Sequence, residues 1–294
     1  MGKVQALGPI VVSLSDNTVV SLPGKRTREV VAALASGAGH PVQRQTVWNW
    51  LWPEMSKENA RRALNTELWR LRQAVNSCGG CADDLIASTP DALRLRTDRG
   101  FDLDLCAFNT IPADSNSVDC LVTKQQLYKG DFAAGIEGEW IETIRRELRG
   151  TYLRLLREIV DSALNTNRLA EAQLFADRLV NEDPYDEKAA RRVIRIALAR
   201  GDHSAAAQAF RALTTRLKDD LDVRPSAKTV ALYQQCQEGT DDTFQPPGFR
   251  IEPAVPEQVA VADARRTLLV IADLVTAIRS ELRTLAQDLE QIGR

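Results

Sequence analysis

The stretch "ARRALNTELWRLRQAV", residues 60–75, is the most informative part of the first hundred residues because it predicts a helix with one buried and one polar side. Apolar residues recur in it at the three- and four-residue spacing of a helix face that must be covered. These apolar residues are Leu64, Leu68, Leu71 and Val75. The polar side and its flanks carry Arg62, Thr66, Trp69 and Gln73, with Asn65, Arg70 and Arg72. The elements around the helix indicate what this polar side faces.

Short strands and helices surround residues 60–75 in an informative order. Turn-forming residues separate the strands, and Gly- and Pro-containing segments end the helices. In chain order the sequence predicts three strands within residues 3–22, helices at 24–39 and 44–53, the helix that begins after Ser56, a loop at 76–84, and hairpin strands at 85–89 and 92–96. This order is typical of an α+β winged helix-turn-helix with an N-terminal sheet. In that fold the third helix enters the major groove and the hairpin lies along the DNA backbone.

The charge distribution agrees with a nucleic-acid interface in this region. The net charge of the chain is −2, but residues 1–100 hold 13 Lys and Arg against 9 Asp and Glu, whereas the remainder holds 25 against 31. The positive potential therefore lies on the N-terminal segment. Arginine suits guanine edges and phosphates, and Asn and Gln suit adenine. We expect the polar side of the third helix to face duplex DNA.

Residues 101–237 predict an all-α domain. A long amphipathic pattern over residues 138–167 predicts one or two helices. The segments "NTNRLAEAQLFA", from residue 165, and "ARGDHSAAAQAF", from residue 199, form a weak internal repeat with an offset of 34, and "DPYD" (183–186) predicts a break between helices. A helix-turn-helix period of 34 residues is that of tetratricopeptide repeats, whose faces bind partner proteins.

The C-terminal residues predict a linker followed by a coiled coil. Residues 238–258 are rich in Pro, Gly and Asp and lack periodicity, as is typical of a linker. Residues 259–294 carry an unbroken heptad pattern, which predicts a homo-oligomer formed through this helix. Leu at a with Ile at d favours more than two strands, although the pattern leaves a dimer open. The a positions are Leu268, Val275, Leu282 and Leu289, and the d positions are Ile271, Ile278, Leu285 and Ile292.

Several stretches resemble a known family in the same order along the chain. "LPGKRTREVVAAL", "PVQRQTVWNWLWPE" and "NARRALNTELWRLRQAV" resemble the winged-helix domain of the Streptomyces antibiotic regulatory protein (SARP) type. "LYKGDFAAGIEGEWIETIRRELRGTYLRLLREI" and "LDVRPSAKTVALYQQ" resemble the start and end of the bacterial transcriptional activator domain (BTAD). The resemblance covers residues 1–237 and divides them into a DNA-binding domain (1–100) and an activator domain (101–237).

The resemblance implies a sequence-specific transcription activator. Such a protein would bind promoter repeats near the −35 region and contact RNA polymerase, including its sigma factor. The DNA contacts that the resemblance and the helix pattern assign are Arg61, Arg62, Asn65, Thr66, Trp69, Arg70, Arg72 and Gln73 on the third helix, and Arg94 and Arg96 on the hairpin. Two alternatives stay open: Trp69 could pack against the hairpin, and Arg70 and Arg72 could pair with Asp83 and Asp84.

Other functional classes find little support in the sequence. Phosphate-loop, nucleotide-binding and hydrolase motifs are missing, and the two histidines are far apart, so we expect no enzyme and no cofactor. Cys78 and Cys81 form a lone CxxC without a second pair, which is weak evidence for a metal or redox site. Trp48, Trp50 and Trp52 favour structural packing over base stacking. Neither a signal peptide nor an apolar run of membrane-spanning length is evident, so we expect a cytoplasmic, nucleoid-associated bacterial protein without membrane contact.

One further alternative is an adaptor that does not bind DNA. The exposed position predicted for Trp69 and the mild positive charge of residues 1–100 would also suit a winged helix that binds protein. The repeats and the coiled coil would then build a protein assembly.

Overall fold

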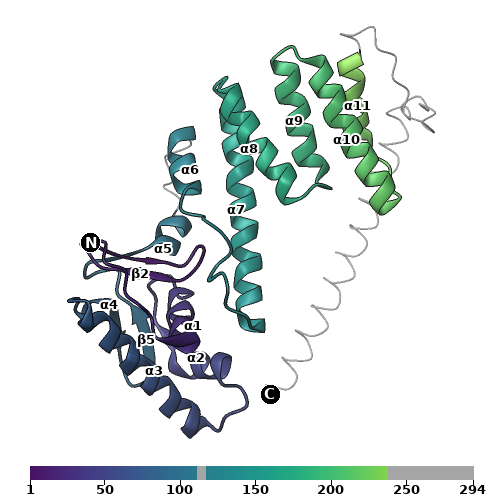
Figure 1. Ribbon diagram of the computed structural model, residues 1–294. Helices are drawn as coiled ribbons and strands as arrows, with labels where there is room; N and C mark the ends of the chain where they lie inside the picture. The colour runs from purple at the N-terminus through teal and green to yellow at the C-terminus, as the bar shows by residue number, and fades with distance from the viewer. Residues whose placement is uncertain (111–116, 238–294) are drawn as a thin grey trace, which may run out of the picture. The chain divides into compact units, whose positions relative to one another are not determined.

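The computed structural model describes residues 1–110 and 117–237, apart from the side chains of 235–237, and all of these lie in one compact unit, Met1–Asp242 (Figure 1). The predicted linker at 238–258 and coiled coil at 259–294 lie outside the described residues. The strands are β1 (Gly2–Gln5), β2 (Val11–Ser13), β3 (Val42–Gln43), β4 (Ile86–Ser88), β5 (Ala92–Leu95) and β6 (Phe101–Leu103). The helices are α1 (Gly24–Ala35), α2 (Arg44–Leu51), α3 (Lys57–Ser77), α4 (Ala82–Leu85), α5 (Asp104–Asn109), α6 (Val118–Gln125), α7 (Glu139–Asn165), α8 (Leu169–Glu182), α9 (Glu187–Ala199), α10 (His203–Leu221) and α11 (Ala227–Gln237).

Two small three-stranded sheets form the β-structure of the N-terminal region. In the first, with the order β2-β1-β6, β1 pairs antiparallel with β2 and parallel with β6. In the second, with the order β3-β5-β4, β5 pairs antiparallel with both neighbours, so the predicted hairpin at 85–96 is confirmed. The first sheet extends past residue 100, because β6 begins at Phe101.

Three details of the N-terminal region differ from the sequence prediction. The strand predicted at 19–22 is wrong, since Val19 forms only an isolated bridge to Ser13 and is 63% exposed. Strands β3 and β6 were not predicted because two and three residues are too few for a visible alternation. The predicted loop at 76–84 also contains the single turn of α4.

The three predicted helices of the N-terminal region are present and share one core. Val30, Val31 and Leu34 of α1 are fully buried, and Leu64 and Leu71 of α3 pack in the same apolar cluster. The helices α1, α2 and α3 contact one another, and α1 also contacts β5 (Figure 1). The chain therefore has the predicted order of a small sheet, three helices and a hairpin.

The second half of the described chain is helical, as predicted. Residues 139–165 form one helix, α7, and each helix from α7 to α11 packs on the next (Figure 1). The internal repeat is confirmed by the starts of α8 and α10 at Leu169 and His203, and by Ala172 and Ala206, which are both fully buried. The break predicted at "DPYD" separates α8 from α9.

Specific contacts join the N-terminal region to α7. Phe132, fully buried, forms a bridge to Leu7, and its carbonyl accepts a hydrogen bond from Arg145 Nε at 2.9 Å. Trp50 of α2 stacks on Trp140 of α7, with ring centroids 4.9 Å apart. The predicted packing role of Trp50 is therefore confirmed. Among the described helices, none is both long enough and apolar enough to span a bilayer.

Candidate nucleic-acid interface

The sequence of α3 fixes which of its sides is left uncovered. The helix begins after Ser56, whose side chain accepts a hydrogen bond from the backbone N–H of Asn59 at 3.4 Å, and Glu58 lies in its first turn, where the helix dipole favours an anion. It ends where Gly79 adopts a φ of +82°, a left-handed conformation that suits glycine. Because Leu64, Leu68 and the other predicted apolar residues are buried, the opposite side faces outward.

Most of the predicted contact residues lie on this outward side. Trp69 is 60% exposed, so the open alternative that it packs against the hairpin is wrong. The exposed residues are Arg61, Arg62, Asn65, Thr66, Trp69, Arg70 and Gln73, and the half-buried ones are Arg72, Arg94 and Arg96. The exposed ring of Trp69 adds an apolar contact surface to this polar side of the helix.

Three of the predicted arginines are paired with carboxylates. Arg62 lies 2.5 Å from Glu58, and Arg94 lies 3.0 Å from Asp98. Arg70 pairs at 2.7 Å with Glu67, so the open alternative that it pairs with Asp83 or Asp84 is wrong. The carboxylate of Glu67 is buried, and its second oxygen accepts a hydrogen bond from Thr27 of α1 at 2.7 Å. This bond holds the carboxylate in place for its pair with Arg70. These pairs partly neutralise the charge that the three arginines offer to an anionic partner.

Arg44, at the start of α2, is a residue that the sequence prediction missed. Its guanidinium donates hydrogen bonds to Asn65 Oδ1 at 3.1 Å, to Ser88 Oγ at 2.6 Å and to the carbonyl of Thr89 at 2.9 Å. Arg44 therefore joins α3 to the hairpin through neutral acceptors and keeps its charge uncompensated. A cation in the first turn of a helix interacts unfavourably with the helix dipole. The position of Arg44 at the start of the predicted second helix was therefore the signal in the sequence that this arginine has a specific role.

Arg44 lies close to two predicted contact residues. The pKa of its guanidinium is lowered, mainly by burial and additionally by repulsion from Arg61 and Arg72. Within the described residues, Arg61 and Arg72 have no ion-pair partner. We define the α3 surface as Arg44, Arg61, Asn65 and Arg72, with the exposed Trp69 beside them. Its guanidinium groups repel one another, which favours binding of an anion such as a phosphate.

The hairpin contributes a second, weaker positive feature. Arg94 and Arg96 alternate along the chain with the buried Leu93 and Leu95, as predicted, and so lie on the opposite face. The pKa of Asp98 is lowered, first by its own backbone N–H and further by the two arginines. The arginines of the hairpin are thus attracted to a neighbouring carboxylate.

The segment Cys78–Cys81 has a structural explanation. Gly79 supplies the left-handed turn after α3, and a Cβ atom on Gly80 would lie 2.7 Å from Leu14 Cδ2. Cys78 and Cys81 are free thiols, and within residues 1–110 and 117–237 no three potential ligand side chains gather into a metal-binding group. The turn and the close packing account for both glycines of the CxxC sequence.

Comparisons with known proteins agree with this arrangement. Residues 113–237 match the bacterial transcriptional activator domain family. The transcriptional regulatory protein MoaR1 of Mycobacterium bovis is 23% identical over 247 residues, which cover 80% of this chain and 79% of MoaR1. The regulatory protein AfsR of Streptomyces coelicolor is 29% identical over 238 residues, which cover 78% of this chain but only 23% of AfsR.

A solved structure supports the same fold. Mycobacterium tuberculosis EmbR, in complex with a low-affinity phosphopeptide, superposes with a TM-score of 0.67 over 92% of this chain and 71% of EmbR, at 20% identity. The solved structure supports the fold alone, whereas the family model and the aligned regulators bear on the family. The chain contains a bacterial transcriptional activator domain at residues 113–237 and is similar, over about four fifths of its length, to transcriptional regulators of the SARP type.

Proposed function

We propose that this chain activates transcription by binding promoter repeats through a winged helix-turn-helix formed by residues 1–100, with α3 in the major groove and the β4–β5 hairpin along the backbone. The observation that supports the proposal most strongly is the α3 surface, where Arg44 lies close to Arg61 and Arg72 and none of the three has an ion-pair partner among the described residues. A cluster of uncompensated guanidinium groups on an exposed helix suits a duplex, whose phosphates are closely spaced.

The residues of the α3 surface would divide the work between positioning and base recognition. Arg61 and Arg72 would contact phosphates or guanine edges. Asn65 would read a base, because the hydrogen bond from Arg44 to its Oδ1 fixes the orientation of the amide and leaves its NH₂ group to donate. The exposed Trp69 would make apolar contact with a thymine methyl group.

The remaining parts of the chain would bring partners to the promoter. We propose that the helical domain of residues 101–237 contacts RNA polymerase, including its sigma factor; this proposal is supported by the resemblance to the family. The heptads between Leu268 and Ile292 would assemble the chain into a homo-oligomer, which would raise the effective concentration of reading heads on repeated sites.

The test begins with selection of bound duplexes from a random pool, followed by measurement of affinity for the selected duplex at several salt concentrations. The double variant Arg61→Ala/Arg72→Ala removes two uncompensated cations. We expect the slope of log affinity against log salt to fall by about 2, because each lost phosphate contact changes the slope by about 0.9.

The matched control is Arg62→Ala/Arg94→Ala, which changes the net charge equally but removes arginines already paired with Glu58 and Asp98. Its affinity and salt slope should change less than those of the first variant. Thermal unfolding by circular dichroism verifies that both variants fold. Equal losses in the two variants would contradict the role of the α3 surface, and failure to select any duplex would favour the adaptor alternative.

A further inference from the structure

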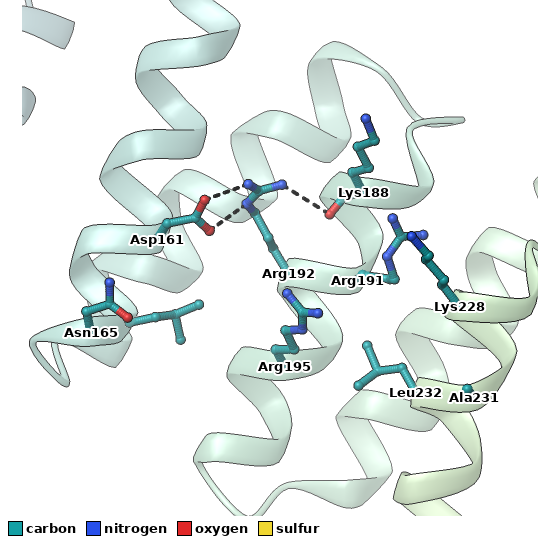
Figure 2. Close-up of a pocket in the computed structure, with 10 residues that line it drawn as sticks. Asp161, Asn165, Lys188, Arg191, Arg192, Arg195, Lys228, Ala231 and Leu232 are labelled. Carbon is teal, nitrogen blue, oxygen red and sulfur yellow. Dashed lines mark hydrogen bonds and ion pairs between the residues drawn. The ribbon is translucent and has the colours of Figure 1, made fainter. Parts of the chain in front are cut away.

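A second basic surface lies between α7, α9 and α11. It is a groove of about 880 Å³, which we call the α9 groove. Figure 2 shows the side chains of α9 between the end of α7 and the start of α11, with Arg192 pointing to Asp161. The residues that line the groove are Asp161, Leu164, Asn165, Lys188, Arg191, Arg192, Arg195, Lys228, Ala231 and Leu232.

The amphipathic sequence of α9 creates the basic side of this groove. Lys188, Arg191 or Arg192, and Arg195 recur at the spacing of one helix face, while Ile194, Ile196 and Ala197 are buried on the other side. The start of α11 adds Lys228 from across the groove (Figure 2). Five cations therefore face one carboxylate, Asp161, among the residues that line the groove.

Two of the five cations are held by the protein, and three are not. Arg192 forms a bidentate ion pair with Asp161, with Nε–Oδ1 at 2.9 Å and Nη2–Oδ2 at 2.6 Å. Arg191 donates a hydrogen bond to Thr229 Oγ1 at 2.8 Å. Lys188, Arg195 and Lys228 are exposed and have no ion-pair partner among the described residues. Like charges gathered without counterions favour an anionic partner.

The position of the groove separates it from the α3 surface. The stacked pair Trp50–Trp140 marks the end of α7 that contacts the N-terminal region. Asp161 comes 21 residues after Trp140, which is about 30 Å further along the helix axis at 1.5 Å per residue. DNA binding by α3 therefore does not explain the five cations of the groove.

The lining of the groove favours a polypeptide over a nucleic acid. Leu164, Ala231 and Leu232 add apolar surface to the lining of the groove beside the cations, which suits apolar side chains but offers nothing to a phosphate backbone. The Arg192–Asp161 pair shows that a guanidinium of this groove takes a carboxylate in the two-pronged geometry. We propose that the α9 groove binds an acidic segment of a partner protein in which Asp or Glu residues alternate with apolar residues. The proposal is independent of DNA binding by α3.

The test measures fluorescence anisotropy of a short fluorescein-labelled peptide rich in Asp, Glu and Leu, titrated with the full chain. A peptide with Asn and Gln in place of the acids serves as the neutral probe. We expect the acidic peptide to bind in a salt-sensitive manner and the double variant Arg195→Glu/Lys228→Glu to bind it at least about tenfold more weakly. The control Arg146→Glu/Arg200→Glu reverses two exposed cations outside the groove and should change the affinity less than about twofold.

A gain-of-binding variant guards against effects on folding. Asp161→Asn releases Arg192 for the peptide, so we expect an affinity several times higher than that of the unmodified chain. Peptide binding that is absent, or that persists in Arg195→Glu/Lys228→Glu, would overturn the proposal. So would residual binding of random duplex DNA by Arg61→Ala/Arg72→Ala that disappears when the groove charges are also reversed, because the groove would then bind nucleic acid.

Discussion

The α3 surface and the α9 groove are both basic, but they differ in shape and in the way their charges are held. On the α3 surface, Arg44 donates its hydrogen bonds to neutral acceptors, and an exposed Trp69 stands beside the cations on a convex helix. In the α9 groove, Arg192 pairs with a carboxylate, and apolar residues line the groove together with the cations. A convex helix fits into the groove of a duplex, whereas a concave site receives a chain.

The number of cations on a basic surface is therefore a poor guide to the partner that the surface binds. Arg62, Arg70 and Arg94 add to the count near α3 but are paired with Glu58, Glu67 and Asp98. An arginine whose hydrogen bonds go to neutral groups keeps its full charge for an incoming anion. Both surfaces hold three cations without an ion-pair partner among the described residues, so shape and apolar lining distinguish them better than charge does.

Arg44→Ala should give the largest difference between the two surfaces. The substitution removes one uncompensated charge and three hydrogen bonds that hold Asn65 and the hairpin in place. We expect the affinity for the selected duplex to fall about tenfold to a hundredfold, equivalent to about 1.4–2.8 kcal/mol, and the affinity for the acidic peptide to stay the same. Anisotropy titrations with both probes measure the two effects.

The matched control for this prediction is Arg195→Ala, which removes one uncompensated cation from the α9 groove. It should weaken the peptide complex and leave the DNA complex unchanged. If each substitution weakened both complexes equally, the two surfaces would share a ligand, and the distinction between them would fail.

Of the residues that form the α3 surface, those on α3 itself could be predicted from the sequence, but Arg44 could not. The helix of residues 60–75 was predictable because its apolar residues follow one period over about three turns, and its outward residues followed from the same pattern. Arg44 was missed because its role depends on Asn65 and Ser88, which lie 21 and 44 residues away. The state of Arg70 was missed for the same reason, because Glu67 is fixed by Thr27 of another helix.

The fold shows the same limit. The order of helices and the 34-residue repeat were predictable from local periodicity. Strand β6 was not, because its three residues become a strand only through pairing with β1, which lies almost a hundred residues earlier. Elements that depend on distant partners leave little trace in their own sequence.

Trp140→Ala tests whether the two regions behave independently. The substitution removes the stack on Trp50 of α2, and we expect the free energy of unfolding to fall by about 1–2 kcal/mol because a half-buried aromatic pair is lost. Under conditions in which the variant is folded, its affinities for duplex and peptide should each stay within about twofold of the original. Urea unfolding and the two titrations measure these effects.

Trp69→Ala is the matched comparison, since it removes a tryptophan that is 60% exposed. We expect it to weaken DNA binding and to leave the unfolding free energy within about 0.5 kcal/mol. A loss of duplex affinity in Trp140→Ala as large as that in Trp69→Ala would mean that α7 orients α3. The N-terminal region and the helical domain would then not bind their ligands independently.

Glu187→Gln should give the smallest effect, confined to the wall of the α9 groove. Glu187 accepts hydrogen bonds from Ser226 Oγ at 2.7 Å and from Thr229 Oγ1 at 2.5 Å, and so ties the start of α9 to the start of α11. Burial opposes ionisation, but these hydrogen bonds outweigh it and lower the pKa of Glu187 below its ordinary value of 4.5. A carboxyl group whose pKa is lower in the folded state stabilises the fold above the unfolded pKa, and this contribution disappears as pH falls through the folded pKa.

The expected loss in Glu187→Gln is therefore about 1 kcal/mol or less near neutral pH, and it should shrink as the pH falls below 4.5. Urea unfolding of both proteins at near-neutral and acidic pH measures the difference. Thr229 is fully buried and donates a hydrogen bond to Glu187, and Lys228, which lines the α9 groove, directly precedes it. The carboxylate of Glu187 therefore helps to position Lys228 in the groove. If the difference in unfolding free energy between the two proteins stayed constant with pH, packing and not the charge of Glu187 would hold α11 in place. The position of Lys228 in the α9 groove would then not depend on the ionisation of Glu187.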